Sequence, residues 1–360
     1  MNSPTEIYQD EIKKLCRLLA ATLKRKVKLM PICAPNSLMI AKYNLNAIES
    51  ECLEFIQGYG EASWSLPPAS IDHAIALSQQ PEIIFTTCEE TINIRGSQQN
   101  LAEAKAQGID VRIVSSPHEA LQIALKQPTR QIIFFGVGFE DSAFNAAETI
   151  LEAQSKKIDN FSIYCNYLSI VPALKAILDS PIVLIDGFIA PSQLSATFGL
   201  DPYRFLVDYY HKPLVVADED PLSMLQATLK LLQQLVDGCA KVEIQTLDFP
   251  SKFDNSGAMP TISQVYQPRD FYEWRGMGSI DYSGLKLKSE YVQFDAEVKF
   301  NLPKLKISDP HSSQCWAVLS GVLNPCQCKV FGPSCNPKNP MGTFMASSDG
   351  VCNQQYNALL

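Results

Sequence analysis

Five cysteines gather near the C-terminal end of the chain, which contains eleven cysteines in all. The five are Cys315, Cys326, Cys328, Cys335 and Cys352. Thiolates are soft ligands, and four of them around one centre hold either a zinc ion or an iron–sulfur cluster. The spacing of these residues therefore predicts a metal site in the C-terminal segment.

Disulfide bonds are the alternative use of these cysteines, but they require an oxidising compartment and are typical of small secreted domains. The first residues contain Glu6, Asp10 and Glu11 and lack the basic start and apolar core of a signal peptide. No run of about 18 apolar residues indicates a membrane span. We therefore expect a cytoplasmic protein with reduced thiols and no membrane partner.

The length and composition of the chain limit the possible architectures. A chain of 360 residues is longer than one core usually organises, so two or three domains are expected. The net charge of -8 argues against nucleic acid as a partner, because phosphate binding needs a concentrated basic surface. The basic residues between Lys13 and Lys28 alternate with leucines, which is typical of an amphipathic first helix.

Short apolar runs alternate with amphipathic helical stretches from about residue 70 to residue 240. Strands are expected at residues 81–87, 111–115, 131–136, 160–165, 182–186 and 213–217. Helices are expected at residues 97–107, 118–126, 143–154, 171–178 and 222–235. This alternation predicts an α/β fold whose parallel sheets are covered by helices on both faces.

The pattern changes after Cys239. Residues 241–310 contain strand-like segments interrupted by Pro250, Pro260, Pro268 and Pro303. We therefore expect a first α/β domain at residues 1–130, a second at 131–240, and a smaller irregular domain at 241–360.

Ligand-binding residues of parallel sheets lie in the loops that follow the strands. Three unusual loops are expected there, at residues 136–141, 187–192 and 217–221. The first is too short for a dinucleotide fingerprint, because the third glycine of that motif would fall on Asp141. The acidic run from Asp218 to Asp220 has the ligand type of a divalent cation site, although such runs are more often solvated turns.

Many short segments between about residues 30 and 356 resemble the hydrogenase maturation protein family HypD. They include Val171-Pro-Ala-Leu-Lys-Ala-Ile-Leu178, Ile185-Asp-Gly-Phe-Ile-Ala-Pro191, Trp274-Arg-Gly-Met-Gly278, Ser283-Gly-Leu285, Phe294-Asp-Ala296 and the cysteine-rich tail. The resemblance implies two parallel-sheet domains and a smaller C-terminal domain that carries a [4Fe-4S] cluster. It also implies a scaffold that works with a HypC-like chaperone and a HypE-like cyanide donor while the Fe(CN)2CO unit of [NiFe] hydrogenase is assembled. In that family, electrons are understood to pass from the cluster through a cysteine pair to the iron.

The resemblance assigns the cluster ligands to the tail cysteines. The matching positions are Cys315, Cys328, Cys335 and Cys352, with Cys326 as the alternate ligand. Two further positions that are cysteines in many family members fall on Ser313 and Phe344. The choice of four ligands among five cysteines therefore stays open.

The active-centre residues implied by the resemblance are largely replaced. Cys33 remains as the candidate iron ligand, whereas the redox thiol pair falls on Glu61 and Trp64. The expected histidines fall on Asn36, Tyr167 and Gln193. Neither replacement of the thiol pair can exchange a disulfide, and a carboxylate is a hard ligand that is poorly matched to low-valent iron. The three replaced histidines also remove imidazoles that titrate near neutral pH.

Three functional hypotheses follow. The first is a maturation factor with a redox role that assembles the iron unit by a modified route through Cys33, with Cys52 or Cys88 nearby. The second is a non-catalytic paralogue that acts as a cluster-bearing scaffold or partner-binding protein. The third is an α/β binding protein with a zinc-bound tail. Cys88 also fits a buried structural cysteine.

Overall fold

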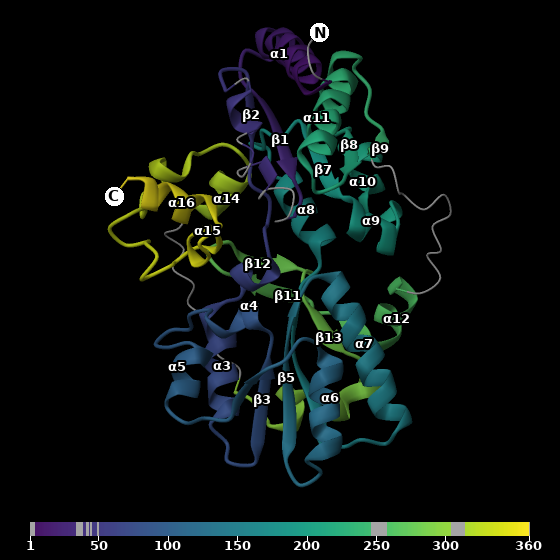
Figure 1. Cartoon of the computed structure of the whole chain (residues 1–360), viewed down its shortest axis with the longest axis vertical. Coiled ribbons are helices and arrows are strands. Elements are labelled where there is room, and N and C mark those ends of the chain that lie inside the picture. The colour runs from purple at the N-terminus through teal and green to yellow at the C-terminus, as the bar shows by residue number, and fades with distance from the viewer. Residues whose placement is uncertain are drawn as a thin grey trace.

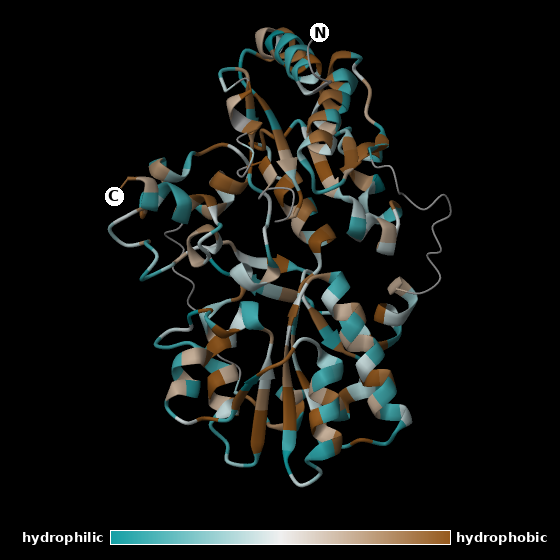
Figure 2. Ribbon diagram, in the orientation of Figure 1, coloured by the Kyte–Doolittle hydropathy of each residue, from teal (hydrophilic) through white to brown (hydrophobic). Residues whose placement is uncertain are grey.

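The computed structural model describes residues 4–33, 39–40, 43, 45–48, 50–245, 258–303 and 314–359. Two parallel sheets lie one above the other, and the C-terminal helices pack at the side of the upper sheet (Figure 1). The strands of both sheets are mostly hydrophobic, whereas the outward faces of the helices are largely hydrophilic (Figure 2). Within the described ranges, no helix combines the length and apolar character needed to cross a bilayer.

The upper sheet has five parallel strands. Their order is β2 (Leu53–Phe55), β1 (Val27–Pro31), β7 (Gly187–Pro191), β8 (Leu214–Ala217) and β9 (Val242–Gln245). Successive side chains of a strand point to opposite faces, so each strand contributes to two cores. One core lies under α1 (Pro4–Leu23) and α11 (Pro221–Val236), and the other lies under α8 (Ile170–Leu178) and α10 (Arg204–Asp208).

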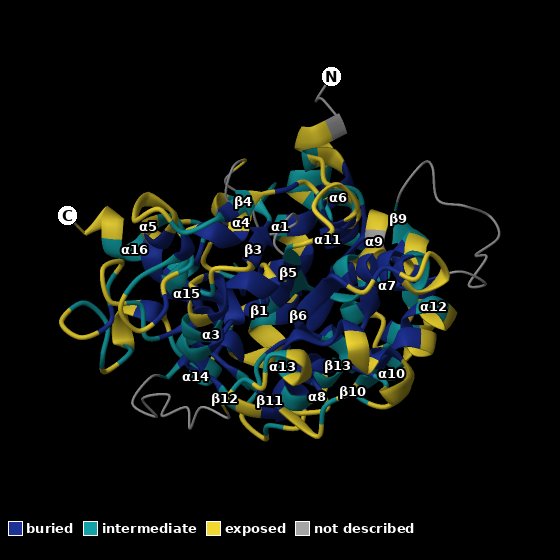
Figure 3. Cartoon of the chain, turned by 90° about the horizontal axis from the view of Figure 1, so that it is seen from below, coloured by how far each residue is buried: buried dark blue, intermediate teal, exposed yellow. Residues whose placement is uncertain are grey.

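The lower sheet has four parallel strands. Their order is β4 (Val111–Ile113), β3 (Ile83–Thr87), β5 (Gln131–Gly138) and β6 (Phe161–Tyr167). Helices α6 (Pro117–Lys126) and α7 (Glu140–Ser155) cover one face, and α3 (Pro68–Ser78) and α5 (Leu101–Ala106) cover the other. The strands are accordingly buried in the middle of the molecule, as the view from below shows (Figure 3). The predicted α/β fold with helices on both sheet faces is confirmed.

The two sheets interleave along the chain, whereas the sequence suggested successive domains divided at residue 130. The upper sheet takes β1 and β2 from before that point and β7, β8 and β9 from after it. The lower sheet likewise takes β3 and β4 from one side and β5 and β6 from the other. Hydrophobic periodicity identifies strands but does not say which strands pair, so it could not reveal this crossover.

One predicted strand, at residues 182–186, is wrong. The strand is β7, which begins at Gly187, and Gly187 pairs with Leu29. Asp186 lies in the connecting segment before β7. Hydrogen bonds fix it there, because its carboxylate accepts two from Arg25 and its backbone N–H donates to the carbonyl of Lys28. Ile182 at the start of the predicted strand is 56% exposed.

The remaining elements are short. After β3 comes α4 (Glu89–Ile92), and after β7 come α9 (Ser192–Phe198) and the 3-10 turn Asp201–Tyr203. The 3-10 turns Leu45–Ala47 and Ala62–Ser65 flank β2. The C-terminal part contains α12 (Ala258–Val265), β10 (Tyr266–Pro268), β11 (Phe271–Trp274), β12 (Gly278–Asp281), β13 (Leu285–Leu287), the 3-10 turn Ser289–Phe294 and α13 (Ala296–Lys299). It ends with α14 (Cys315–Leu319), the 3-10 turn Pro325–Gln327, α15 (Thr343–Ala346) and α16 (Val351–Ala358).

This C-terminal part packs on both sheets. Strands β10 and β13 pair antiparallel and contribute Tyr266, Leu285 and Leu287 to a core of the lower sheet. The tail helices and the β11–β12 hairpin instead join the core beneath the upper sheet. The region thus consists of short elements that pack against both sheets.

Candidate functional site

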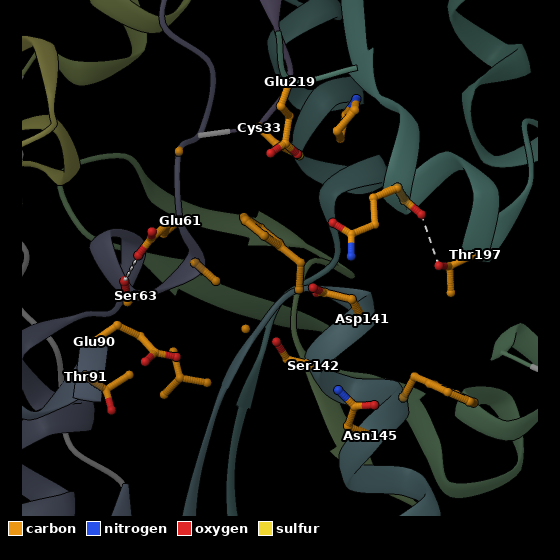
Figure 4. Close-up of a pocket in the computed structure, with 18 residues that line it drawn as sticks. Cys33, Glu61, Ser63, Glu90, Thr91, Asp141, Ser142, Asn145, Thr197 and Glu219 are labelled. Atoms are coloured by element: carbon orange, nitrogen blue, oxygen red, sulfur yellow. Dashed lines mark hydrogen bonds between the residues drawn. The ribbon is translucent and has the colours of Figure 1, made fainter. Parts of the chain in front are cut away.

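A cavity of about 780 Å³ lies where the carboxyl ends of strands from both sheets meet (Figure 4). Its lining residues are Cys33, Gly60, Glu61, Ala62, Ser63, Glu90, Thr91, Val137, Gly138, Phe139, Asp141, Ser142, Phe144, Asn145, Pro191, Gln193, Thr197 and Glu219. Cys33 follows β1, residues 60–63 follow β2, Glu90 and Thr91 follow β3, and Glu219 follows β8. The others lie at the ends of β5 and β7 and in the segments that follow them, including α7 and α9. Each of the three unusual loops noted in the sequence contributes to this central pocket, which agrees with the rule for parallel sheets.

Cys33 follows β1 and is 5% exposed, with its side chain at the wall of the central pocket. Burial raises the pKa of its thiol well above the ordinary value, and the nearby carboxylates of Glu140, Asp141 and Glu219 add to this. The thiol is therefore protonated at neutral pH. A metal that binds there must displace the proton.

The two positions expected to carry the thiol pair point in different directions. Glu61 faces the central pocket, and burial followed by repulsion from Glu90 raises the pKa of its carboxyl. Trp64 is buried and packs against Gly60, where an added Cβ would lie 2.1 Å from the indole ring. Gly60 has φ +70°, and an added Cβ at Gly58 would lie 2.1 Å from the carbonyl oxygen of Pro31. Both glycines are therefore required by the backbone path of this loop.

The charge of the central pocket is negative. Four carboxylates line it, from Glu61, Glu90, Asp141 and Glu219, and its described lining residues include no lysine, arginine or histidine. Burial, followed by repulsion from Asp218, raises the pKa of the Glu219 carboxyl. Such a lining repels anions and attracts cations.

The remaining active-centre positions are scattered. Gln193 lines the central pocket, whereas Tyr167 is buried with its ring against Tyr266, at a centroid distance of 5.8 Å. Asn36 lies outside the described residues. Glu140 is not in the lining because its carboxylate accepts hydrogen bonds from Ser169 Oγ at 2.6 Å and from the Ile170 N–H at 3.0 Å.

The sequence missed several polar residues of the central pocket, among them Glu90, Thr91 and Asn145. Glu90 and Thr91 closely follow the end of β3, so the strand-end rule could have identified them. Asn145 lies one turn into α7, where no sequence signal marks it.

The two other candidate thiols do not line the central pocket in the described structure. Cys52 packs at the edge of the core beneath α1 and α11. Cys88 is the N-cap residue of α4 and packs against the core of the lower sheet. Burial raises the pKa of the Cys88 thiol to about 12, which is consistent with a structural rather than a reactive cysteine.

A second, much smaller cavity of about 20 Å³ lies in the tail. Its lining residues are Cys315, Val318, Cys328, Val330, Phe331, Cys335, Gly342, Met345 and Cys352. The structure thus brings four of the five tail cysteines to one cavity, which we call the cysteine cavity. Cys326 is outside this lining, and its exposed thiol donates a hydrogen bond to Gln355 Oε1 at 2.9 Å.

Two glycines let the backbone approach the cysteine cavity closely. An added Cβ at Gly342 would lie 2.2 Å from the Sγ of Cys315, and one at Gly276 would lie 3.0 Å from the same sulfur. Gly276 also has φ +71°, which favours glycine. The family-like segment around Gly276 therefore has a packing role beside a sulfur atom.

The chemistry of the cysteine cavity suits a thiolate-bound centre. Its other lining residues are apolar or glycine, and burial raises the pKa of the Cys335 and Cys352 thiols. Deprotonation of these thiols would therefore accompany binding of any positive centre. Within the ranges described, no three His, Cys, Asp or Glu side chains form a group that could hold one metal ion. Ser313 lies outside those ranges, and Phe344 is buried in the adjacent core.

Residues 57–66 physically connect the two cavities. The Gln57 amide donates to the carbonyl of Asp349 at 3.0 Å and accepts from the Val351 N–H, next to Cys352. Arg275 is 2% exposed and donates to the carbonyls of Leu66, Arg95 and Pro340. Together these bonds fix the cysteine cavity relative to the loop that carries Glu61.

Comparisons with known proteins identify a matching family model and several relatives. The family model HypD, described as the hydrogenase formation hypA family, matches residues 7–358. A hydrogenase maturation factor HypD of Rhodobacter capsulatus is 37% identical over 346 residues, covering 95% of this chain and 92% of the relative. The Escherichia coli protein of the same name is 36% identical over 356 residues, covering 98% and 95%. A hydrogenase expression/formation protein HupD of Azotobacter chroococcum is 33% identical over 363 residues, covering 97% and 96%.

Proposed function

The chain belongs to the HypD family of hydrogenase formation proteins, and on that premise we propose that it is a maturation factor for [NiFe] hydrogenases. In this proposal it serves as a scaffold and electron-transfer protein while the Fe(CN)2CO unit is assembled. Its partners are a HypC-like chaperone and a HypE-like cyanide donor. The observation that carries the proposal is the convergence of four tail cysteines on one cavity in a chain of this family.

Cys315, Cys328, Cys335 and Cys352 would hold a [4Fe-4S] cluster, with Cys326 outside the ligand set. Such a cluster supplies one-electron transfer. Gly276 and Gly342 support this assignment, because they leave room beside the Cys315 sulfur that any side chain would fill. Gln57 and Arg275 position the cluster-binding tail against the loop of the central pocket.

The central pocket would receive the iron unit as substrate, with the Cys33 thiol as its protein ligand. Cys33 is the thiol in the lining of that pocket. An apolar pocket of about 430 Å³ adjoins it and shares Cys33, Phe139 and Asp141, which offers a partner an apolar surface beside the thiol.

A second candidate function, a non-catalytic paralogue that keeps the cluster as a scaffold, is favoured by a specific observation. Glu61 occupies the pocket wall where a redox thiol is expected, and four carboxylates would repel an anionic iron–cyanide unit. Neither Glu61 nor the buried Trp64 can relay electrons by disulfide exchange.

Complementation of a HypD-deficient bacterial strain distinguishes the two candidates. The maturation function predicts that the wild-type chain restores hydrogenase activity, and that Cys33→Ser abolishes the rescue. Cys239→Ser is the matched control, because this half-buried thiol lies after α11 and lines neither cavity. Failure of a well-expressed wild-type chain to complement would contradict the maturation function and support the paralogue.

A further inference from the structure

The C-terminal tail differs in charge from the rest of the chain. The whole chain has a net charge of -8, yet residues 314–359 contain two lysines, Lys329 and Lys338, and one acidic residue, Asp349. Both lysines are exposed, whereas Asp349 is half-buried and its carbonyl accepts a hydrogen bond from Gln57. The tail therefore presents a weakly basic surface on an otherwise acidic protein.

The two lysines lie close to residues of the cysteine cavity. Lys329 directly follows Cys328 in the chain. Lys338 follows Cys335 by three residues, in a turn where its N–H donates to Asn336 Oδ1 at 3.1 Å. The path of the backbone therefore keeps both positive charges near two of the proposed cluster ligands.

One side of the cysteine cavity reaches the protein surface. Of its four thiols, Cys328 is half-buried and the other three are buried. Phe331 also lines the cavity, and its ring packs against Tyr356 of α16 at a centroid distance of 6.2 Å. Both rings are half-buried, so part of each is open to solvent. Cys328 and these two rings therefore connect the cavity with the surface.

Cys326 extends the same surface. Its exposed thiol donates to Gln355, which neighbours Tyr356 on α16. This helix lies at the outer edge of the molecule, where a partner can reach it (Figure 1). The contacts define one continuous area, which we call the tail surface and which consists of Cys326, Lys329, Phe331, Lys338, Gln355 and Tyr356.

The proposed electron transfer requires an external reductant. A cluster that passes one electron to the iron unit is itself oxidised by one electron, and it must regain one before the next transfer. Electron-transfer proteins meet through small, short-lived interfaces, and complementary charges steer their encounter. A surface with aromatic rings and basic neighbours, beside the cavity that would hold the cluster, fits a carrier whose own surface is acidic.

We propose that the tail surface is the docking site of an acidic one-electron carrier protein that reduces the cluster. The redox centre of the carrier loses one electron and the cluster gains it, and no covalent bond or proton is exchanged. Lys329 and Lys338 attract the acidic side chains of the carrier, while Phe331 and Tyr356 provide the apolar contact. This assignment rests on the proposed function, because a chain without the cluster has no group to receive the electron.

Calorimetry of the anaerobically purified full chain with an acidic plant-type [2Fe-2S] ferredoxin measures docking without any turnover. We expect a complex that weakens about tenfold when the salt concentration rises from about 20 mM to about 200 mM. Lys329→Glu and Lys338→Glu should each weaken binding about fivefold. Lys126→Glu is the matched control, because this exposed lysine ends α6 on the lower sheet, and it should leave the affinity unchanged.

Stopped-flow measurements test whether docking delivers the electron. Reduced ferredoxin should bleach the visible absorbance of the cluster, and either lysine substitution should slow this step about fivefold at low salt. Photoreduced deazaflavin, a small uncharged reductant, should reduce the wild type and both variants equally, which shows that each retains an intact cluster. Tyr356→Ala is the second variant if Lys329→Glu disturbs the neighbouring Cys328, and it should weaken ferredoxin binding about threefold.

The docking surface is overturned if ferredoxin binding responds neither to salt nor to the two lysine substitutions, or if bound ferredoxin does not reduce an intact cluster. It is also overturned if the chain forms dimers that Lys329→Glu dissociates, because a second copy then covers the tail surface. Iron analysis of the same preparation separates this proposal from the proposed function. A folded chain without iron contradicts the cluster assignment, whereas an iron-loaded chain that fails these tests contradicts the docking surface alone.

Discussion

The cysteine cavity and the central pocket share a rigid glycine-dependent backbone but differ in their chemical side chains. At the cysteine cavity, Gly276 and Gly342 lie against the Cys315 sulfur, and four thiols remain together. At the central pocket, Gly58 and Gly60 are equally constrained, yet a carboxylate stands where a thiol is expected. Backbone contacts constrain a glycine whatever chemistry the pocket performs, whereas a side chain that faces the cavity can change without disturbing the fold.

The connection between the two regions carries the largest expected effect. Arg275→Met should destabilise the chain by about 3–5 kcal/mol, because it removes the donor of one buried and two part-buried hydrogen bonds to main-chain carbonyls. Urea unfolding followed by circular dichroism measures the change. Arg204→Met is the control, since its exposed pair with Asp201 should contribute less than about 1 kcal/mol. Equal effects of the two substitutions would show that Arg275 does not join the regions.

The constraint on the loop of the central pocket gives the next largest effect. Gly60→Ala should cost about 2–4 kcal/mol, because a left-handed backbone and a clash with the Trp64 ring act together. Gly108→Ala separates the two causes, since Gly108 has φ +94° with nothing within 4 Å of an added Cβ. It should cost only about 1 kcal/mol. Thermal unfolding measures the loss of stability in both variants. Equal losses would refute the packing role of Gly60.

The charge of the central pocket has the smallest expected effect. Glu219→Gln removes a carboxylate that raises the pKa of Cys33, so more thiolate forms at a given pH. Alkylation of Cys33 by iodoacetamide at pH 8, followed by peptide mass spectrometry, should become about two- to fivefold faster. Glu148→Gln, an exposed position on α7, should leave the rate unchanged. An unaltered rate in the Glu219 variant would mean that the Glu219 carboxylate does not influence the Cys33 thiol.

The sequence predicted individual strands and helices better than it predicted which of them pair in space. The strands at β3, β5, β6 and β8 were found because continuous apolar runs mark buried parallel strands. The position of β7 was missed because the run at residues 182–185 is equally apolar, and only the ion pair of Asp186 with Arg25 shows that it is a connection. That pair joins residues far apart in the sequence, which local periodicity does not detect.

The same limit applies to the sites. Proximity of Cys315, Cys328 and Cys335 follows partly from their spacing, but the exclusion of Cys326 from the cavity depends on its bond to Gln355 in α16. Cys33 could be identified only by resemblance to a family motif. The four carboxylates that line the pocket around Cys33 come from four separate segments, so no single stretch of sequence predicts the acidic lining.

The most direct test of the contrast is the iron and acid-labile sulfide content of anaerobically purified protein, measured with electron paramagnetic resonance on wild type, Cys328→Ser and Cys326→Ser. The account predicts about four irons and four sulfides per chain with a cubane signal in the wild type and in Cys326→Ser, and loss of that signal in Cys328→Ser. Zinc in place of iron, or loss of the cluster in Cys326→Ser with retention in Cys328→Ser, would contradict it.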